Sequence, residues 1–230
     1  MRRDNQVLIF DADDTLWENN IRFERAIDTF LDEVARPPIS RAAARAALDR
    51  IEAANAKTHG YGAQVFLRSL VECFEQLRGR PADAAEQARF AALAASITSA
   101  EVELIPGVAQ TLPALAARHE LLLLTKGDQA EQRAKVDASG LAGLFRSVHI
   151  VAEKDFSEYY WLIGEEALEP ERTWMIGNSP KSDILPARAV GLNAVFIPHQ
   201  HTWTLEEAEL DPADSRVLRL TTFAELEEHF

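Results

Sequence analysis

Cysteine, basic residues and long apolar runs are all scarce in this sequence of 230 residues. The single cysteine, Cys73, excludes a disulfide within the chain, so the sequence suits a reducing compartment. Lysine and arginine number 24 against 37 aspartate and glutamate residues, and the formal net charge is -13. This acidity argues against nucleic acid or an anionic membrane as the main partner. An anionic substrate would therefore need a local basic patch and a metal.

We expect no targeting signal in the first residues of the sequence. Residues 1–6 are polar and lead directly into four apolar residues, a run too short for a signal peptide or a membrane span. We therefore expect a cytoplasmic protein. The length suffices for one large core, or for one core with a smaller insert.

The most informative stretch reads VLIFDADDTL, from Val7 to Leu16. Its four apolar residues predict a strand buried on both faces, and three acids follow within four positions. Asp11 and Asp13 repel each other by roughly 1 kcal/mol in water and by more in a drier cleft. A divalent cation offsets this repulsion most simply, and ligands bind at the ends of parallel strands. The stretch thus predicts a site for a metal and a phosphate.

The remainder of the chain divides into a helical part and an alternating part. From residue 17 to about 104 the apolar residues recur only at helical spacing. After Pro106-Gly107, strands alternate with helices, and we expect strands at 121–124, 147–151, 173–176, 193–197 and 217–220. Such alternation predicts a parallel sheet covered on both faces. The predicted fold is an α/β core (1–16 and 105–230) with an inserted all-helical domain (17–104).

Four of the predicted strands end in the residue types that phosphoryl transfer requires. Their ends share one edge of a parallel sheet, so distant segments can converge there. Asp11 is the expected nucleophile, which would form an aspartyl-phosphate, and Asp13 would protonate the leaving oxygen and then activate water. Thr125 and Lys154 would contact the phosphoryl oxygens. The oxygen ligands expected for Mg²⁺ are Asp11, Asp13, Asn178 and Asp183.

The order of these motifs resembles that of the haloacid dehalogenase superfamily. The matching elements are Asp11-Ala12-Asp13-x-Thr15, Thr125 after an apolar strand, Lys154, and Gly177-Asn178-x-x-x-x-Asp183. This resemblance covers nearly the whole core. It implies a Rossmann-like three-layer core and a Mg²⁺-dependent phosphatase with an aspartate nucleophile. The place of the helical insert, between the first two motifs, resembles the family's C1-type cap.

Two positions depart from the family pattern. Asp14 stands where the family usually has glycine, and we expect it in the turn that leads to the insert, pointing away from the metal. Asn178 stands where the family usually has an acid. Its amide oxygen can coordinate Mg²⁺ but brings no charge, which predicts weaker binding that Asn178→Asp would improve. Whether Asn178 or Asp183 is the direct ligand stays open.

Several other polar residues are candidate contacts for the substrate. They are Lys126, Asn20, His59 and Tyr61. The last two lie in a glycine-flanked loop of the insert, and in C1-capped relatives such a loop helps to choose the substrate. An ordinary surface position or helix connection is an equally good interpretation of each. His199 and His201 suggest a metal pair, but no third ligand is near in sequence, so we favour a loop.

The predicted function is hydrolysis of a small phosphorylated metabolite by a monomer or homodimer. A sugar-phosphate mutase, similar to β-phosphoglucomutase, would use the same two aspartates but return the phosphoryl group to the substrate. A 2-haloacid dehalogenase would use Asp11 on carbon and need no metal. A non-catalytic module that binds a phosphorylated ligand is the alternative from another class. The insert is expected to close over the substrate about hinges near residues 17–20 and 101–107.

Overall fold

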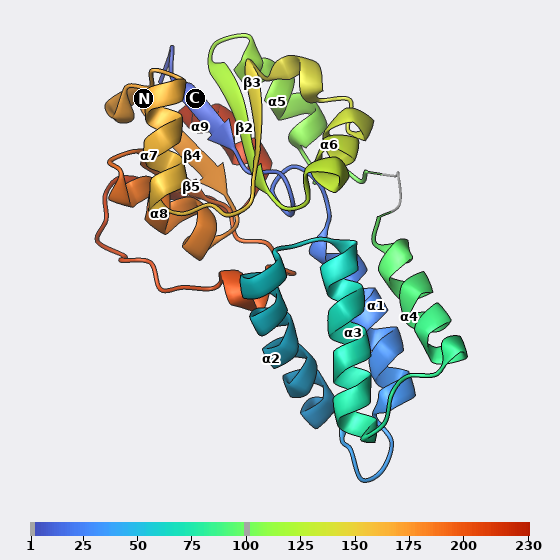
Figure 1. Ribbon diagram of the computed structural model, residues 1–230. Coiled ribbons are helices and arrows are strands. Elements are labelled where there is room, and N and C mark those ends of the chain that lie inside the picture. The colour runs from blue at the N-terminus through green and yellow to red at the C-terminus, as the bar shows by residue number, and fades with distance from the viewer. Residues whose placement is uncertain (1–2, 99–101) are drawn as a thin grey trace. The chain divides into compact units, whose positions relative to one another are not determined.

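The computed structural model describes residues 3–98 and 102–230, and the chain forms two compact units (Figure 1). One unit comprises Met1–Asn20 with Glu101–Phe230, and the other is Ile21–Ala100. Each unit has a hydrophobic core of its own. The domain limits proposed from the sequence, at residues 16 and 105, lie a few positions from the limits of these units.

The core of the first unit is a six-stranded parallel sheet with the order β3-β2-β1-β4-β5-β6. Its strands are β1 (Val7–Phe10), β2 (Glu120–Lys126), β3 (Ser147–Val151), β4 (Thr173–Gly177), β5 (Asn193–Phe196) and β6 (Val217–Arg219). Phe10 of the central β1 pairs with Leu123 on one side and Ile176 on the other. Each expected strand is confirmed to within two residues at its ends.

Helices cover both faces of the sheet, because alternate residues of β1 point to opposite sides. Leu8 and Phe10 pack in one cluster with α5, α6 and α9, whereas Ile9 packs in another with α7 and α8. These helices are α5 (Val108–Ala116), α6 (Gln129–Ala138), α7 (Phe156–Glu165), α8 (Leu185–Ala189) and α9 (Leu226–His229). The predicted Rossmann-like three-layer architecture is confirmed.

Short turns complete this unit. They are the 3₁₀ turns η1 (Ala142–Leu144), η2 (Pro170–Arg172), η4 (Thr204–Glu206) and η5 (Phe223–Glu225), and the π-helical turn η3 (Pro180–Ile184). The turn η3 begins three residues after the end of β4 and carries Asp183. Across the residues that the structure describes, no helix has both the length and the apolar character needed to cross a membrane.

The second unit is helical, as the spacing of its apolar residues predicts. It is built from α1 (Asn20–Val34, which begins at the unit's edge), α2 (Arg41–His59), α3 (Ala63–Arg78) and α4 (Ala84–Ser96). Phe30, Phe74 and Phe90 meet in its core, where the ring of Phe90 lies 5.4 Å from that of Phe30 and 5.3 Å from that of Phe74. Cys73 is fully buried beside them in the same cluster.

Candidate active site

The candidate site lies where the strand order reverses, between β1 and β4, which is where open α/β sheets bind ligands. Asp11 follows β1 directly, and its backbone N–H donates to the carbonyl of Ile176 at 2.9 Å. Its Oδ1 accepts a hydrogen bond from Lys154 Nζ at 2.6 Å, and its Oδ2 accepts one from the Thr15 hydroxyl at 2.8 Å. Both oxygens of the expected nucleophile are therefore fixed in place.

Lys154 is buried, although it lies in the charged sequence Glu153-Lys154-Asp155. Its ammonium bridges Asp11 and Asp183 and also approaches the carbonyl of Leu124 at 3.4 Å. Burial alone would lower the pKa of Lys154, but the charges of Asp11 and Asp183 raise it well above its usual value. Lys154 thus brings a fixed positive charge to the end of the sheet, which excludes a solvated surface lysine.

Asp183 anchors Lys154 from the turn that follows β4. Its Oδ1 accepts from Lys154, its Oδ2 accepts from the backbone N–H of Ser179 at 2.9 Å, and the side chain is fully buried. Burial and the charge of Asp11 raise the pKa of Asp183, against the effect of Lys154. Gly177 permits this approach, since a Cβ at that position would lie 2.1 Å from Asp183 Oδ2. Both oxygens of Asp183 are therefore engaged within the protein.

Asn178 faces the nucleophile through a shared hydroxyl group. The Oγ1 of Thr15 lies 2.8 Å from Asp11 Oδ2 and 3.3 Å from Asn178 Oδ1. The amide nitrogen of Asn178 donates to Thr202 Oγ1 at 3.0 Å, which orients the amide oxygen toward Thr15. A carboxylate oxygen and an amide oxygen therefore lie on either side of one hydroxyl, and both are hard ligands of the kind that Mg²⁺ accepts.

Asp13 is held by three donors that sequence reasoning did not single out. Oδ1 accepts from Trp17 Nε1 at 2.7 Å, Oδ2 accepts from Gln132 Nε2 at 2.8 Å, and Lys135 Nζ lies 2.9 Å from each oxygen. Burial alone would raise the pKa of Asp13, but Lys135, Gln132 and Trp17 together lower it. The polar residues 132 and 135, one helical turn apart after the second motif, were the available signal in the sequence.

The repulsion between the acids of the first motif is thus offset in a way that the sequence did not reveal. Lys154 neutralises Asp11 from 143 residues away, and Lys135 neutralises Asp13 from 122 residues away. With Asp183 included, these two ammonium groups face three carboxyl groups, and burial and the charge of Asp11 raise the pKa of Asp183. Two lysines of the protein therefore do part of what the sequence predicts for a divalent cation, and the oxygen ligands are what favours a metal here.

Thr125 and Lys126 end β2 beside this cluster. Thr125 is almost fully buried, and its contact with a phosphoryl group stays a prediction. The ammonium of Lys126 bonds three protein acceptors, namely Ser182 at 2.9 Å, Glu153 at 3.0 Å and Glu206 at 2.7 Å. Burial alone would raise the pKa of Glu206, but Lys126 lowers it to about 2. A substrate could bind Lys126 only by exchanging one of these partners.

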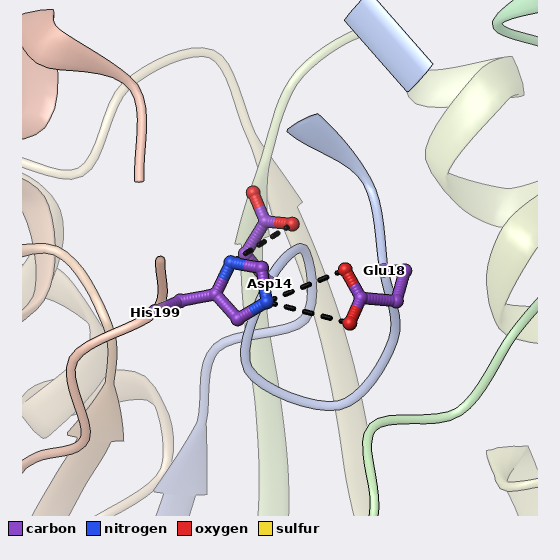
Figure 2. Close-up of side chains that lie close together, drawn as sticks. All are labelled: Asp14, Glu18 and His199. Carbon is purple, nitrogen blue, oxygen red and sulfur yellow. Dashed lines mark hydrogen bonds and ion pairs between the residues drawn. The ribbon is translucent and has the colours of Figure 1, made fainter. Parts of the chain in front are cut away.

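A second polar cluster joins Asp14, Glu18 and His199 (Figure 2). His199 Nδ1 lies 3.7 Å from Asp14 Oδ1, and Nε2 lies 3.3 Å from Glu18 Oε2. Their ligand atoms all lie within 4.8 Å of one another, a spacing that could hold a metal ion. The backbone N–H of His201 already donates to His199 Nδ1 at 3.3 Å, so the ring proton belongs on Nε2, facing Glu18. Both ring nitrogens thus have partners within the protein.

Asp14 itself turns toward the start of α1. Its backbone φ is 61°, in the left-handed region that favours glycine and that aspartate tolerates. The carboxylate accepts the backbone N–H groups of Asn19 and Asn20, at 2.9 and 3.0 Å. Burial raises its pKa to about 7 against these two hydrogen bonds, and the charges of Asp13 and Asp11 add to the rise. The carboxylate serves a turn, as the sequence suggests.

The loop that contains both histidines is bound to the start of α1 and to the fourth motif. Asn20 Nδ2 donates to the carbonyl of His201 at 2.6 Å, and Thr202 accepts from Asn178. Sequence reasoning treated 199–203 as an ordinary loop because the partners of His199 are about 180 positions away in the chain. The side-chain amide of Asn20, a predicted substrate contact, is engaged with this loop.

His59 and Tyr61 belong to the helical unit. His59 is the last residue of α2 and is exposed, whereas Tyr61 is half-buried in the connection to α3. The structure describes this unit by itself, so the role of both residues in substrate choice stays a prediction.

Comparison with known proteins agrees with the motifs. A family model described as haloacid dehalogenase-like hydrolase matches residues 6–191. A structure of a haloacid dehalogenase-like family hydrolase from Xanthomonas campestris is 26% identical, with a TM-score of 0.82 over 98% of this chain and 97% of that one.

More distant structures share the fold. A predicted phosphoglycolate phosphatase from Haemophilus somnus and a 2-haloacid dehalogenase from Pseudomonas syringae are each 19% identical over 97% of both chains, with TM-scores of 0.64 and 0.61. No curated protein shows significant similarity to the chain. The family model covers most of the sequence, and the chain belongs to the haloacid dehalogenase-like hydrolases.

Proposed function

We propose that this hydrolase is a Mg²⁺-dependent phosphatase that cleaves a small phosphomonoester. The observation that carries the proposal is a second carboxylate, Asp13, two residues after the Asp11 nucleophile and fixed by three donors. Cleavage of an ester expels an alkoxide, which needs a proton, whereas cleavage of a carbon–halogen bond expels halide, which needs none. A positioned carboxylate therefore favours phosphate esters over haloacids as substrates.

Asp11 would attack the phosphorus through one carboxylate oxygen. The new bond to phosphorus forms as the bond to the leaving oxygen breaks, and that oxygen takes a proton that Asp13 must first have bound, because Lys135, Gln132 and Trp17 lower the pKa of Asp13. Water then attacks the phosphorus of the aspartyl-phosphate and passes its proton to Asp13, so that Asp11 and inorganic phosphate are released. Lys154 and Thr125 supply donors to the phosphoryl oxygens, where negative charge gathers in the transition state.

The residues present fit a magnesium ion modestly. Asp11 and Asn178 offer two oxygens beside the Thr15 hydroxyl, while the oxygens of Asp183 are engaged by Lys154 and Ser179. We therefore favour Asp11 and Asn178 as the side-chain ligands, with Asp183 in support through Lys154. When bound, the ion would lower the electrostatic cost of bringing a phosphate beside these acids. The amide ligand leaves the expected affinity lower than that of a site with one more acid.

The experiment is a panel of phosphorylated metabolites and 2-haloacids assayed with Mg²⁺, beside EDTA controls and Asp11→Asn. We expect phosphate release that EDTA and the substitution abolish, and no halide release. Halide release that persists in EDTA would make the protein a dehalogenase. An isomeric phosphosugar without free phosphate would make it a mutase. Tight binding without any turnover would leave a binding module.

A further inference from the structure

Lys135 contacts both carboxylate oxygens of Asp13, and the proposed reaction assigns it no role. It lies on α6, and its ammonium contacts both carboxylate oxygens of Asp13 at 2.9 Å and the side-chain oxygen of Asn19 at 2.8 Å. The side chains of Lys135 and Asp13 retain 22% and 21% of their exposure, so the pair lies at the accessible edge of the site. A substrate that reaches the Asp13 carboxylate would therefore meet it in the position set by Lys135.

The local structure of α6 places Lys135 there together with Gln132. The two residues are three positions apart and so share one face of the helix. Asp128 caps the helix by accepting the backbone N–H groups of Ala130 and Glu131, at 2.9 and 3.0 Å. Gly127 lets the loop pass closely, since a Cβ there would lie 2.9 Å from Gln132 Nε2. The cap at Asp128 fixes where α6 begins, and Gly127 leaves room for the Gln132 side chain that contacts Asp13.

The side-chain amide of Gln132 presents its nitrogen, and not its oxygen, to Asp13. Its Nε2 donates to Asp13 and to the carbonyl of Lys126, at 2.8 and 3.1 Å. Its Oε1 is buried and, among the residues that the structure describes, has no hydrogen-bond partner. Turning the amide over would set this oxygen against two acceptors, the Asp13 carboxylate and the Lys126 carbonyl, so the amide keeps the orientation that donates to Asp13.

We propose that Lys135 is a positioning residue that holds Asp13 in the orientation from which it exchanges a proton with the leaving oxygen. The inference rests on the proposed function, because it assigns Asp13 a proton-transfer role. Lys135, on α6, contacts both carboxylate oxygens of Asp13, whereas Trp17 and Gln132 each donate to a single oxygen. Loss of Lys135 removes the donor that contacts both oxygens and leaves one donor on each, so Asp13 is held less firmly, whereas Asp11, Thr125 and Lys154 keep their places.

This role makes a prediction that depends on the leaving group. Proton transfer from a positioned acid contributes typically about 100-fold or more in rate when the leaving oxygen is strongly basic. An alkyl phosphate such as glycerol phosphate has such an oxygen, whereas p-nitrophenyl phosphate releases a stable anion without help. Loss of Lys135 should therefore slow the first substrate far more than the second.

The test compares kcat and KM of Lys135→Met, Lys135→Arg, Asp13→Asn and Arg133→Met on both substrates. Arg133→Met is the matched control, because Arg133 is an exposed cation on the same helix. We expect Lys135→Met to lower kcat for glycerol phosphate about 100-fold, with a much smaller loss on p-nitrophenyl phosphate and an unchanged KM. Lys135→Arg should recover part of the loss, and Arg133→Met should match the wild type.

Equal losses of kcat on both substrates, a change confined to KM, or failure of both Lys135 variants to fold would each overturn the role of Lys135. The Asp13→Asn arm separates this from failure of the proposed function. If Asp13→Asn discriminates between the leaving groups and Lys135→Met does not, only the inference about Lys135 fails. If Asp13→Asn shows no discrimination, the proton-transfer role of Asp13 fails with it.

Discussion

Lys154 Nζ lies 2.6 Å from Oδ1 of Asp11 and bonds Asp183 at the same time, so one buried ammonium joins the end of β1 to the turn after β4. Replacing it with methionine leaves two buried carboxylates without a counter-charge. We expect Lys154→Met to abolish phosphate release and to lower the free energy of unfolding by about 3–5 kcal/mol at neutral pH. Urea-induced unfolding and steady-state kinetics measure the two effects.

The double variant Lys154→Met with Asp183→Asn supplies the control for that prediction. Removing the second buried charge should restore part of the stability but none of the activity, because the lysine also serves the phosphoryl group. Stability of Lys154→Met equal to that of the wild type would show that the ion pairs do not hold these segments together.

Gly177→Ala tests the close contact between β4 and Asp183. The added Cβ would lie 2.1 Å from Asp183 Oδ2, so the carboxylate must leave Lys154 or the strand must shift. We expect the free energy of unfolding to fall by several kcal/mol, and each kcal/mol lowers the melting temperature by about 2–4 °C. Activity should fall as well. The matched control is Gly164→Ala in α7, where a Cβ would meet nothing within 4 Å. That change should stabilise the helix by about 0.5–1 kcal/mol. Equal melting temperatures for the two variants would contradict the contact.

Asn178→Asp tests the metal site. The change adds one charge to the oxygen that faces Thr15 and removes the donor to Thr202. We expect Mg²⁺ to bind roughly tenfold more tightly, which corresponds to about 1.4 kcal/mol. Titration calorimetry measures the affinity, and Asn5→Asp, an exposed position, controls for the change in net charge. If both substitutions change the affinity for Mg²⁺ equally, Asn178 is not a ligand of the metal.

Glu52 in α2 predicts a pH-dependent stability for the helical unit. Burial raises its pKa to about 8 from an ordinary 4.5, the charge of Asp49 adds to the rise, and its Oε2 has no hydrogen-bond partner among the described residues. Because the folded carboxyl keeps a proton that the unfolded one loses, stability is greatest below about pH 4.5 and falls as the pH rises toward about 8. The slope is at most about 1.4 kcal/mol per pH unit.

Urea-induced unfolding followed by circular dichroism across this range measures that slope. Glu52→Gln should flatten it and stabilise the protein at the alkaline end. Glu72→Gln, an exposed acid of α3, should leave the slope as it is in the wild type. A profile that Glu52→Gln does not change would show that Glu52 ionises freely in the folded protein.

The sequence predicts the α/β core and the helical insert well because each rests on local periodicity. The apolar runs that start at Val7 and Leu121 form neighbouring parallel strands, and the acid-rich turn after the first lies at the strand-order reversal. Order in the chain also favoured a functional Lys154 over a surface one, and its burial beside Asp11 agrees with that choice.

What the sequence could not predict are contacts between residues far apart in the chain. The pairing of Asp13 with Lys135 and of His199 with Glu18 depends on how α6 and the loop after β5 approach the first motif. No local pattern carries that information. For the same reason the sequence overstated the repulsion between Asp11 and Asp13, since the lysines that offset it lie more than 100 residues away.

The most direct test of the account is the chemical state of Asp11 during turnover. Asp13→Asn should still accept a phosphoryl group from p-nitrophenyl phosphate, but it lacks the base that activates water for the second step. Rapid acid quenching and peptide mass spectrometry should then find phosphate on the peptide of Asp13→Asn that contains Asp11. No peptide of the Asp11→Asn variant should carry phosphate. Turnover of p-nitrophenyl phosphate without phosphate on Asp11 would contradict the account.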